Sequence, residues 1–219
     1  DLEKIRNRFG SNGVKFTVLL LDNSHGTNQG LIQQIETKFL KRFYKSFIDW
    51  LLMDEEVGLI IKTKKPHVLH SLKQNSNFLD IAYNTKRCYV VERPFQEISL
   101  NYAKISNISV AIGTSMASAL LECVSTGAKG IFYDYPNLRS LEKDIYSWGE
   151  NKVFFQNLDN MINIIKSFKK DPIKNNFVGN WSSYLPLIDP FRDGRGGERI
   201  GNYMYWLKKE LSKGLDKKE

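Results

Sequence analysis

Short apolar runs alternate along this chain with longer amphipathic stretches. Residues 15–21 and 58–62 are predicted as strands buried on both faces, and between them, from about Gln29 to Asp54, apolar residues recur at helical spacing. Four more strands are predicted at residues 88–92, 108–112, 130–134 and 153–155. Six apolar strands that alternate with helices indicate an α/β fold, a doubly wound, Rossmann-like, six-stranded parallel sheet with right-handed crossovers.

The common strand order of such sheets, 3-2-1-4-5-6, places a reversal between the first and fourth strands. Ligands bind in the crevice at the carboxyl ends of these two strands. The topology therefore nominates two loops, residues 22–27 after the first strand and residues 113–118 after the fourth. Both loops consist mostly of small and polar residues.

The loop after the fourth strand is predicted to hold phosphate. Gly113 permits close approach of a ligand, while Thr114 and Ser115 can cap the next helix, so that N–H groups and the positive end of the helix dipole face the crevice. Ser118 belongs to the same loop, and Glu122, further along the helix, is placed to accept hydrogen bonds from ribose hydroxyls. The alternative is plain helix capping, which Ser and Thr perform in any protein.

The first loop and the end of the second strand supply further candidates. His25 is the candidate catalytic residue, because it can act as a base near neutral pH or donate a hydrogen bond to phosphate. Gly26 and Thr27 lie in the same loop as expected phosphate contacts. Lys62 and Lys64 follow the second strand, where cations can offset diphosphate charge. The alternatives are a merely solvated histidine and lysines that only promote solubility.

The composition is that of a globular protein with anionic partners. Of the 219 residues, 42% are hydrophobic and 26% are charged, and 32 Lys and Arg against 24 Asp and Glu give a formal net charge of +8. This charge favours polyanionic partners such as nucleotides, anionic lipid or nucleic acid, and its sign alone does not choose among them. No specific nucleic-acid partner is predicted. The longest apolar run, about six residues, is far shorter than the roughly 20 residues that a membrane-spanning helix needs.

One domain over residues 1–219 is expected, and the first residue, Asp1 rather than Met, indicates a domain excised from a longer chain. Cys88 and Cys123 fall in a predicted strand and a predicted helix and form no disulfide framework, which favours a reducing cytoplasm. The chain has no Cys-x-x-Cys pair and three histidines, so no metal site and no cofactor are predicted.

The chain is predicted to end in a helix within residues 195–219. One apolar stripe follows its helical spacing, made of Ile200, Tyr203, Met204, Leu207 and Leu211. We expect this stripe to pack against protein, with peripheral contact to a membrane surface as the alternative. The lysines in this region are expected to form a solvated face.

One segment resembles the donor-binding segment of GT-B glycosyltransferases, namely Ser109-Val-Ala-Ile-Gly-Thr-Ser-Met-Ala-Ser-Ala-Leu-Leu-Glu-Cys-Val-Ser-Thr-Gly-Ala-Lys-Gly-Ile-Phe-Tyr-Asp134. In that family a strand, a Gly/Ser/Thr turn and a Glu-bearing helix lead to another strand. The resemblance implies that Thr114 and Ser115 hold the nucleotide's phosphates and that Glu122 holds its ribose. The whole chain is similar to the C-terminal region of bacterial surface-polysaccharide biosynthesis proteins.

A second motif, Asp189-Pro-Phe-Arg-Asp-Gly-Arg-Gly-Gly-Glu-Arg-Ile200, resembles the ending of the non-hydrolysing UDP-N-acetylglucosamine 2-epimerases, which share the GT-B fold. The chain departs from that ending at Asp189, Arg192 and the Gly196-Gly197 pair. The phosphate turn of the epimerases is replaced by residues 114–118. The resemblance therefore favours a transferase over an epimerase.

Together these resemblances imply the C-terminal half of a metal-independent glycosyltransferase of surface polysaccharide synthesis. Its expected partners are a nucleotide-sugar donor, a glycan or lipid-linked acceptor and an N-terminal acceptor domain. The expected location is the cytoplasm, with the inner face of the membrane as the alternative. Two alternatives stay open: an epimerase-like enzyme of the same fold, and a non-catalytic nucleotide-binding or interaction module.

Overall fold

A computed structural model of the 219-residue chain describes residues 2–22, 37–65, 68, 70, 72, 77–93, 96–113, 118–134 and 149–213. The chain divides into two compact units, Asp1–Trp181 and Ser182–Glu219. Each unit has its own architecture.

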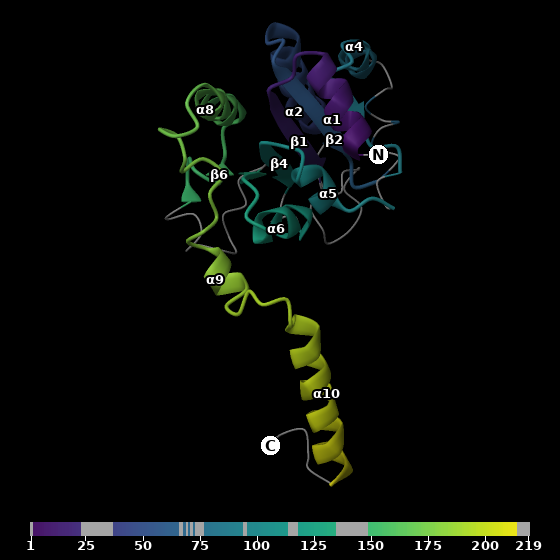
Figure 1. The fold of residues 1–219 in the computed structure, drawn as a ribbon, viewed down its shortest axis with the longest axis vertical. Helices are drawn as coiled ribbons and strands as arrows, with labels where there is room; N and C mark the ends of the chain where they lie inside the picture. Colours follow the sequence, from purple (N-terminus) through teal and green to yellow (C-terminus); the bar gives the residue numbers. More distant parts are fainter. Residues whose placement is uncertain are drawn as a thin grey trace. The chain divides into compact units, whose positions relative to one another are not determined.

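The first unit is a layered α/β structure (Figure 1). Its strands are β1 (Phe16–Asp22), β2 (Val57–Lys62), β3 (Cys88–Val90), β4 (Ile108–Gly113), β5 (Gly130–Asp134) and β6 (Phe154–Phe155). Its helices in the described part of the chain are α1 (Leu2–Ser11), α2 (Thr37–Met53), α4 (Phe78–Asn84), α5 (Ser99–Ala103), α6 (Ser118–Ser125) and α8 (Leu158–Lys170).

The six strands form one parallel sheet in the order β3-β2-β1-β4-β5-β6. The predicted fold class, strand count and strand order are therefore confirmed, and each predicted strand overlaps an observed one. β1 ends one residue later than expected, at Asp22, and β3 is shorter than expected. Of the helix predicted from about Gln29, residues 29–36 lie outside the described part.

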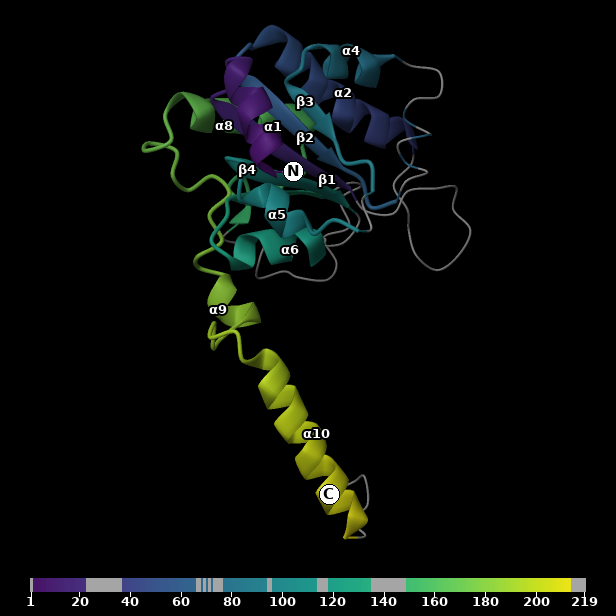
Figure 2. The same cartoon turned by 45° about the vertical axis from the view of Figure 1, so that its right-hand side comes forward.

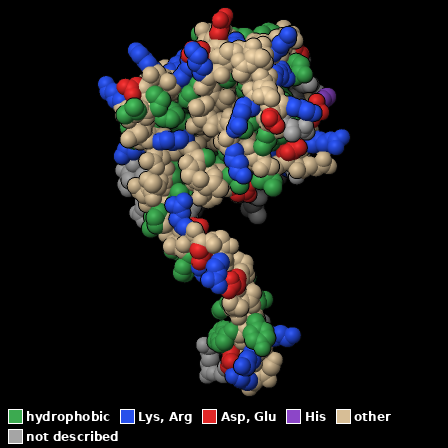
Figure 3. All heavy atoms as spheres, in the orientation of Figure 1, with side chains coloured by type: hydrophobic (Ala, Val, Ile, Leu, Met, Phe, Trp, Pro, Cys, Tyr) green, Lys and Arg blue, Asp and Glu red, His purple; other side chains and the backbone are tan. Residues whose placement is uncertain are grey.

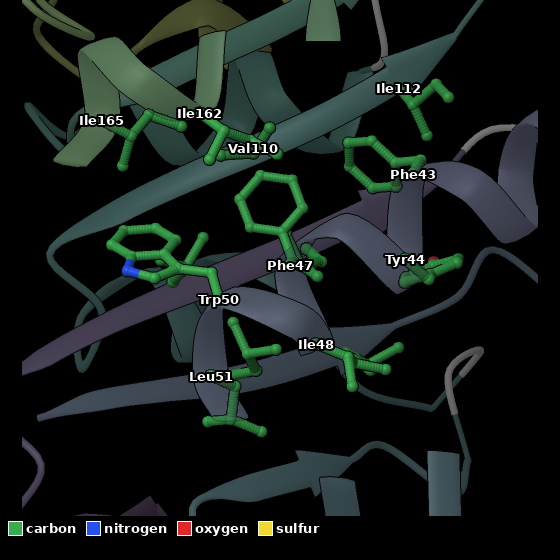
Figure 4. Close-up of a cluster of buried hydrophobic side chains, with 14 of the residues drawn as sticks. Phe43, Tyr44, Phe47, Ile48, Trp50, Leu51, Val110, Ile112, Ile162 and Ile165 are labelled. Atoms are coloured by element: carbon green, nitrogen blue, oxygen red, sulfur yellow. The ribbon is translucent and has the colours of Figure 1, made fainter. Parts of the chain in front are cut away.

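One face of the sheet packs on the aromatic side of α2. Phe43 and Phe47, one helical turn apart, contact each other edge to face with ring centroids 5.2 Å apart, and Phe43 stacks on Tyr133 of β5 at 6.2 Å. Figure 4 shows Phe47 pointing toward Val110 of β4 and Ile162 of α8, and Phe43 beside Ile112 of β4. Full burial of each large apolar side chain contributes roughly 1.5–3 kcal/mol, so this face is a main source of stability.

The opposite face is covered by α1, α5 and α6, which lie on one side of the strands in Figure 2. The α1 helix was not predicted; its buried residues, Ile5 and Phe9, are spaced i, i+4. A Cβ on Gly58 of β2 would approach the Phe9 ring to 3.0 Å, so α1 crosses closely over β2. Under α6, Trp181 donates from its indole nitrogen to the Gly130 carbonyl at 2.7 Å.

A buried arginine ties α2 to the sheet. One guanidinium nitrogen of Arg87 donates to three carbonyls, those of Leu51 at 2.9 Å, Asp54 at 2.8 Å and Val57 at 3.0 Å. Carbonyl groups at the end of a helix lack intrahelical partners and carry partial negative charge. Arg87, placed just before β3, therefore caps α2 and fixes the turn into β2.

The second unit contains α9 (Leu185–Ile188) and α10 (Gly196–Ser212). The predicted C-terminal helix is thus present within residues 195–219, and within its own unit no residue of α10 is buried. Two ion pairs hold the first turns of α10, Arg199 with Asp193 and Arg195 with Glu198. In the part of the chain that the structure describes, no helix has the length and apolar character needed to cross a membrane.

We predict that Gly130→Ala destabilises the protein by about 1–3 kcal/mol, because the added methyl would overlap the buried side chains of Val124 and Leu120 on α6. Urea unfolding measures the change. Gly10→Ala is the matched control, since nothing lies within 4 Å of its Cβ and alanine favours the helix, so a gain of about 0.5–1 kcal/mol is expected. Equal stabilities of the two variants would contradict the close packing of α6 on β5.

Candidate functional site

The carboxyl ends of four strands meet at one edge of the sheet. The register aligns Leu21 with Lys62 across β1 and β2, and Gly113 with Asp134 across β4 and β5. Asp22, the last residue of β1, is aligned with β4 residue Ile112. The strand order reverses between β1 and β4, and this edge is where a doubly wound sheet leaves room for a ligand.

Asp22 is buried at this edge, with 5% of its surface exposed. The Tyr44 hydroxyl of α2 donates to its Oδ2 at 2.9 Å, and the backbone N–H of Lys64 donates to its Oδ1. Burial raises the pKa of the Asp22 carboxyl to about 7, although both hydrogen bonds and the charges of Lys62 and Lys64 favour its ionised form. A carboxyl group at the candidate site therefore titrates near neutral pH.

Lys62, at the end of β2, is half-buried at the same edge. Burial lowers the pKa of its ammonium group, while the charges of Asp22, Glu122 and Glu97 act in the opposite direction. Lys62 and Glu122, predicted as phosphate and ribose contacts, thus lie within electrostatic reach of each other. The α6 residue Glu122 is exposed and accessible from solvent.

A tyrosine pair borders the same region. The rings of Tyr89, in β3, and Tyr102, in α5, stack with centroids 6.2 Å apart. Burial raises the pKa of the Tyr102 phenol, and the neighbouring Tyr89 hydroxyl and Glu97 carboxylate raise it further. The Tyr102 hydroxyl therefore stays protonated at neutral pH, and it is hydrogen-bonded to Tyr89 and Glu97.

The structure brings together the described members of the predicted site. Gly113 is the buried last residue of β4, and Ser118 is the exposed first residue of α6, which follows β4 and begins at this edge. Lys62 and Lys64 lie at the end of β2 and just after it. The other predicted site residues, His25, Gly26, Thr27, Thr114 and Ser115, lie outside the described part, so their roles stay predictions.

Three residues of this edge were missed as site residues. Asp22 and Asp134, each buried, are the final residues of β1 and β5, and Tyr44 lies on the buried face of α2. An acidic residue directly after an apolar run was the available signal for both aspartates. No pattern in the sequence pairs Tyr44 with Asp22, because 22 residues separate them.

Charge is spread over the first unit, and Figure 3 shows Lys and Arg side chains distributed over the visible face with Asp and Glu among them. In the described ranges, no group of three or more His, Cys, Asp or Glu side chains is arranged to hold a metal ion.

Cys88 and Cys123 are both free and buried, in β3 and α6 as predicted. Burial raises the pKa of the Cys123 thiol to about 11 and that of the Cys88 thiol to about 12, so both are weak nucleophiles.

Comparison of the chain with protein-family models, with curated proteins and with solved structures found no match in any of the three.

We predict that the stability of the protein relative to its Asp22→Asn variant falls as the pH rises from about 5 to about 7.5. Asp22 keeps its proton up to about pH 7 when folded but loses it near pH 3.8 when unfolded. In this window unfolding releases a proton, so rising pH favours the unfolded state by up to about 1.4 kcal/mol per pH unit. Urea unfolding of both proteins at several pH values measures the difference, and parallel stability curves would contradict the raised pKa.

Proposed function

We propose that this chain is the nucleotide-sugar-binding domain of a metal-independent glycosyltransferase of the GT-B kind, acting in the cytoplasm in surface polysaccharide synthesis. The observation that carries the proposal is the reversal of strand order between β1 and β4, with Lys62, Lys64, Gly113 and the start of α6 at the carboxyl edge. Ligand sites of doubly wound sheets lie at such a reversal.

The chemistry of this edge suits a nucleotide diphosphate. Lys62 and Lys64 supply positive charge, and the amino end of α6 adds the positive end of a helix dipole. Glu122 offers an acceptor for ribose hydroxyls.

In the proposed reaction, cations and helix dipoles stabilise the negative charge that develops on the leaving nucleotide. His25 is the candidate base within this chain. The acceptor, a glycan or a lipid-linked sugar, binds to a further, N-terminal domain, which would hold the remaining catalytic groups.

The epimerase alternative rests on the motif at residues 189–200. Its polar groups bond to one another: the backbone N–H of Arg192 donates to Asp189, that of Arg195 donates to Asp193, and Arg199 pairs with Asp193. These bonds give the motif a structural role in starting α10. The motif therefore supports the shared fold more strongly than it supports epimerase chemistry.

The first experiment is a thermal-shift screen with UDP, GDP, CDP and CMP. A ligand present at 100 times its Kd stabilises the protein by about 2.7 kcal/mol, which gives a measurable rise in Tm. Incubation with the corresponding nucleotide sugar and an acceptor mixture then separates transfer, epimerisation and binding without turnover. A protein that binds none of the four nucleotides would contradict the proposed function.

We predict that Lys62→Ala weakens nucleotide binding about three- to tenfold at low salt and less at high salt, because screening reduces the attraction between a partly exposed cation and phosphate. Lys15→Ala is the charge-matched control, since Lys15 precedes β1 at the opposite edge and pairs with Glu56. Calorimetric titration with the nucleotide found in the screen measures both variants. If Lys62→Ala bound the nucleotide as tightly as wild type at low salt, the phosphate contact would be wrong and Lys62 would serve only solubility.

A further inference from the structure

The segment that follows β2 is held to the end of β1 by one buried carboxylate. The oxygens of Asp22 accept hydrogen bonds from two elements, Oδ2 from the Tyr44 hydroxyl of α2 and Oδ1 from the backbone N–H of Lys64. Within the segment, the buried Thr63 hydroxyl donates to the Lys65 carbonyl at 3.1 Å. Together these bonds fix the turn that carries the lysine side chains.

We propose that Asp22 is a positioning residue for anion binding: its carboxyl group holds the segment of residues 63–65 at the end of β1, and so sets where Lys64 meets a phosphate-bearing ligand beside Lys62. This role rests on the proposed function, because it concerns the same edge of the sheet and the same class of ligand.

The choice of a carboxyl group at this position has a cost. Removing an ionised carboxylate from water costs several kcal/mol, whereas a neutral amide could accept the Lys64 hydrogen bond without that cost. Among the described residues, the titratable groups that act on Asp22 are Tyr44, Lys62 and Lys64. Burial holds the pKa of the Tyr44 phenol well above its usual range, so Tyr44 stays neutral and the two lysines supply the charge.

Ionised Asp22 competes with a ligand for the same two cations. A phosphate group that approaches Lys62 and Lys64 is attracted by them and repelled by the Asp22 carboxylate. The neutral acid removes the repulsion while its carbonyl oxygen still accepts from the Lys64 N–H. Because the pKa of Asp22 is about 7, binding of an anion near neutral pH is coupled to uptake of a proton.

Two substitutions separate position from charge. The amide of Asp22→Asn keeps an acceptor for the Lys64 N–H and lacks the charge. Asp22→Ala removes both the charge and the hydrogen bond to the Lys64 N–H. Asp49→Ala is the matched control, because Asp49 is an α2 carboxylate that pairs with Lys45 on the surface. The probes are inorganic pyrophosphate, which needs no base recognition, and UDP, GDP and CDP, each titrated by calorimetry at about pH 6 and about pH 8.

The expected results differ between the variants. Asp22→Ala binds pyrophosphate and the preferred nucleotide about tenfold more weakly than Asp22→Asn at both pH values, since both variants lack the charge and only Asp22→Ala also lacks the hydrogen bond that fixes the turn. Asp22→Asn matches wild type at about pH 6 and binds about three- to tenfold more tightly than wild type at about pH 8, where only wild type carries the extra negative charge. The protonation of the ligand changes with pH in the same way for wild type and for both variants, so it does not affect the ratios of their affinities.

Amide hydrogen exchange at Lys64 tests the same tie without a ligand. Exchange should be slow in wild type and in Asp22→Asn, and at least about tenfold faster in Asp22→Ala, because a lost hydrogen bond exposes the N–H to water. If Asp22→Ala fails to fold, Tyr44→Phe replaces it: loss of one donor to the carboxylate raises the pKa of Asp22 and moves the midpoint of the pH dependence of binding upward.

The outcomes separate the two proposals. Wild-type protein that binds none of the probes overturns the nucleotide-binding function, and exchange at Lys64 then decides alone whether Asp22 positions the segment. Unchanged exchange at Lys64 in Asp22→Ala overturns the positioning role. Nucleotide binding with equal affinity and equal pH dependence in wild type, Asp22→Ala and Asp22→Asn overturns it as well, while leaving the nucleotide-binding function in place.

Discussion

A parallel sheet imposes the constraint on which the rest of this structure depends. Parallel strands need long crossovers to connect them, and these crossovers place helices over both faces. All six strands here run in one direction, so every strand points its carboxyl end to the same edge. Residues as far apart in the chain as Asp22, Lys62 and Gly113 are neighbours at that edge only because of this shared direction.

Burial on both faces also explains the chemistry of the site. The face under α2 is lined by buried aromatic side chains, and Asp22, the last residue of β1, is buried at its rim. A carboxyl group in that position loses most of its hydration, which raises its pKa, and it recovers part of the loss through Tyr44 and the Lys64 N–H. The same packing that stabilises the sheet thus sets the protonation behaviour of the edge.

The second unit follows a different principle. The turns at its start are stabilised by local pairs, Arg195 with Glu198 and Arg199 with Asp193, rather than by a buried core. Exposed ion pairs each contribute little, typically below about 1 kcal/mol. The conformation of residues 189–200 therefore depends on short-range bonds that the sequence motif itself contains.

The sequence by itself determined the strands, their order and most of the candidate edge. Apolar runs bounded by polar turns are enough to find strands buried on both faces, and the common topology then brings Lys62, Gly113 and Glu122 together. The sequence did not determine α1. The two buried residues of this helix, Ile5 and Phe9, make only a short apolar pattern, and their burial depends on packing over β2. Local patterns report periodicity, and such a pattern is too brief to identify a helix.

Only the tertiary structure decided the role of Asp22. In the sequence it is the first polar residue after an apolar run, and nothing local distinguishes a solvated loop residue from a buried carboxyl group. The partners that distinguish them, Tyr44 and the Lys64 N–H, come from a helix and from another strand end. Hydrogen bonding and desolvation depend on distance in space, which sequence periodicity does not encode, so the pairing became visible only once the sheet was assembled.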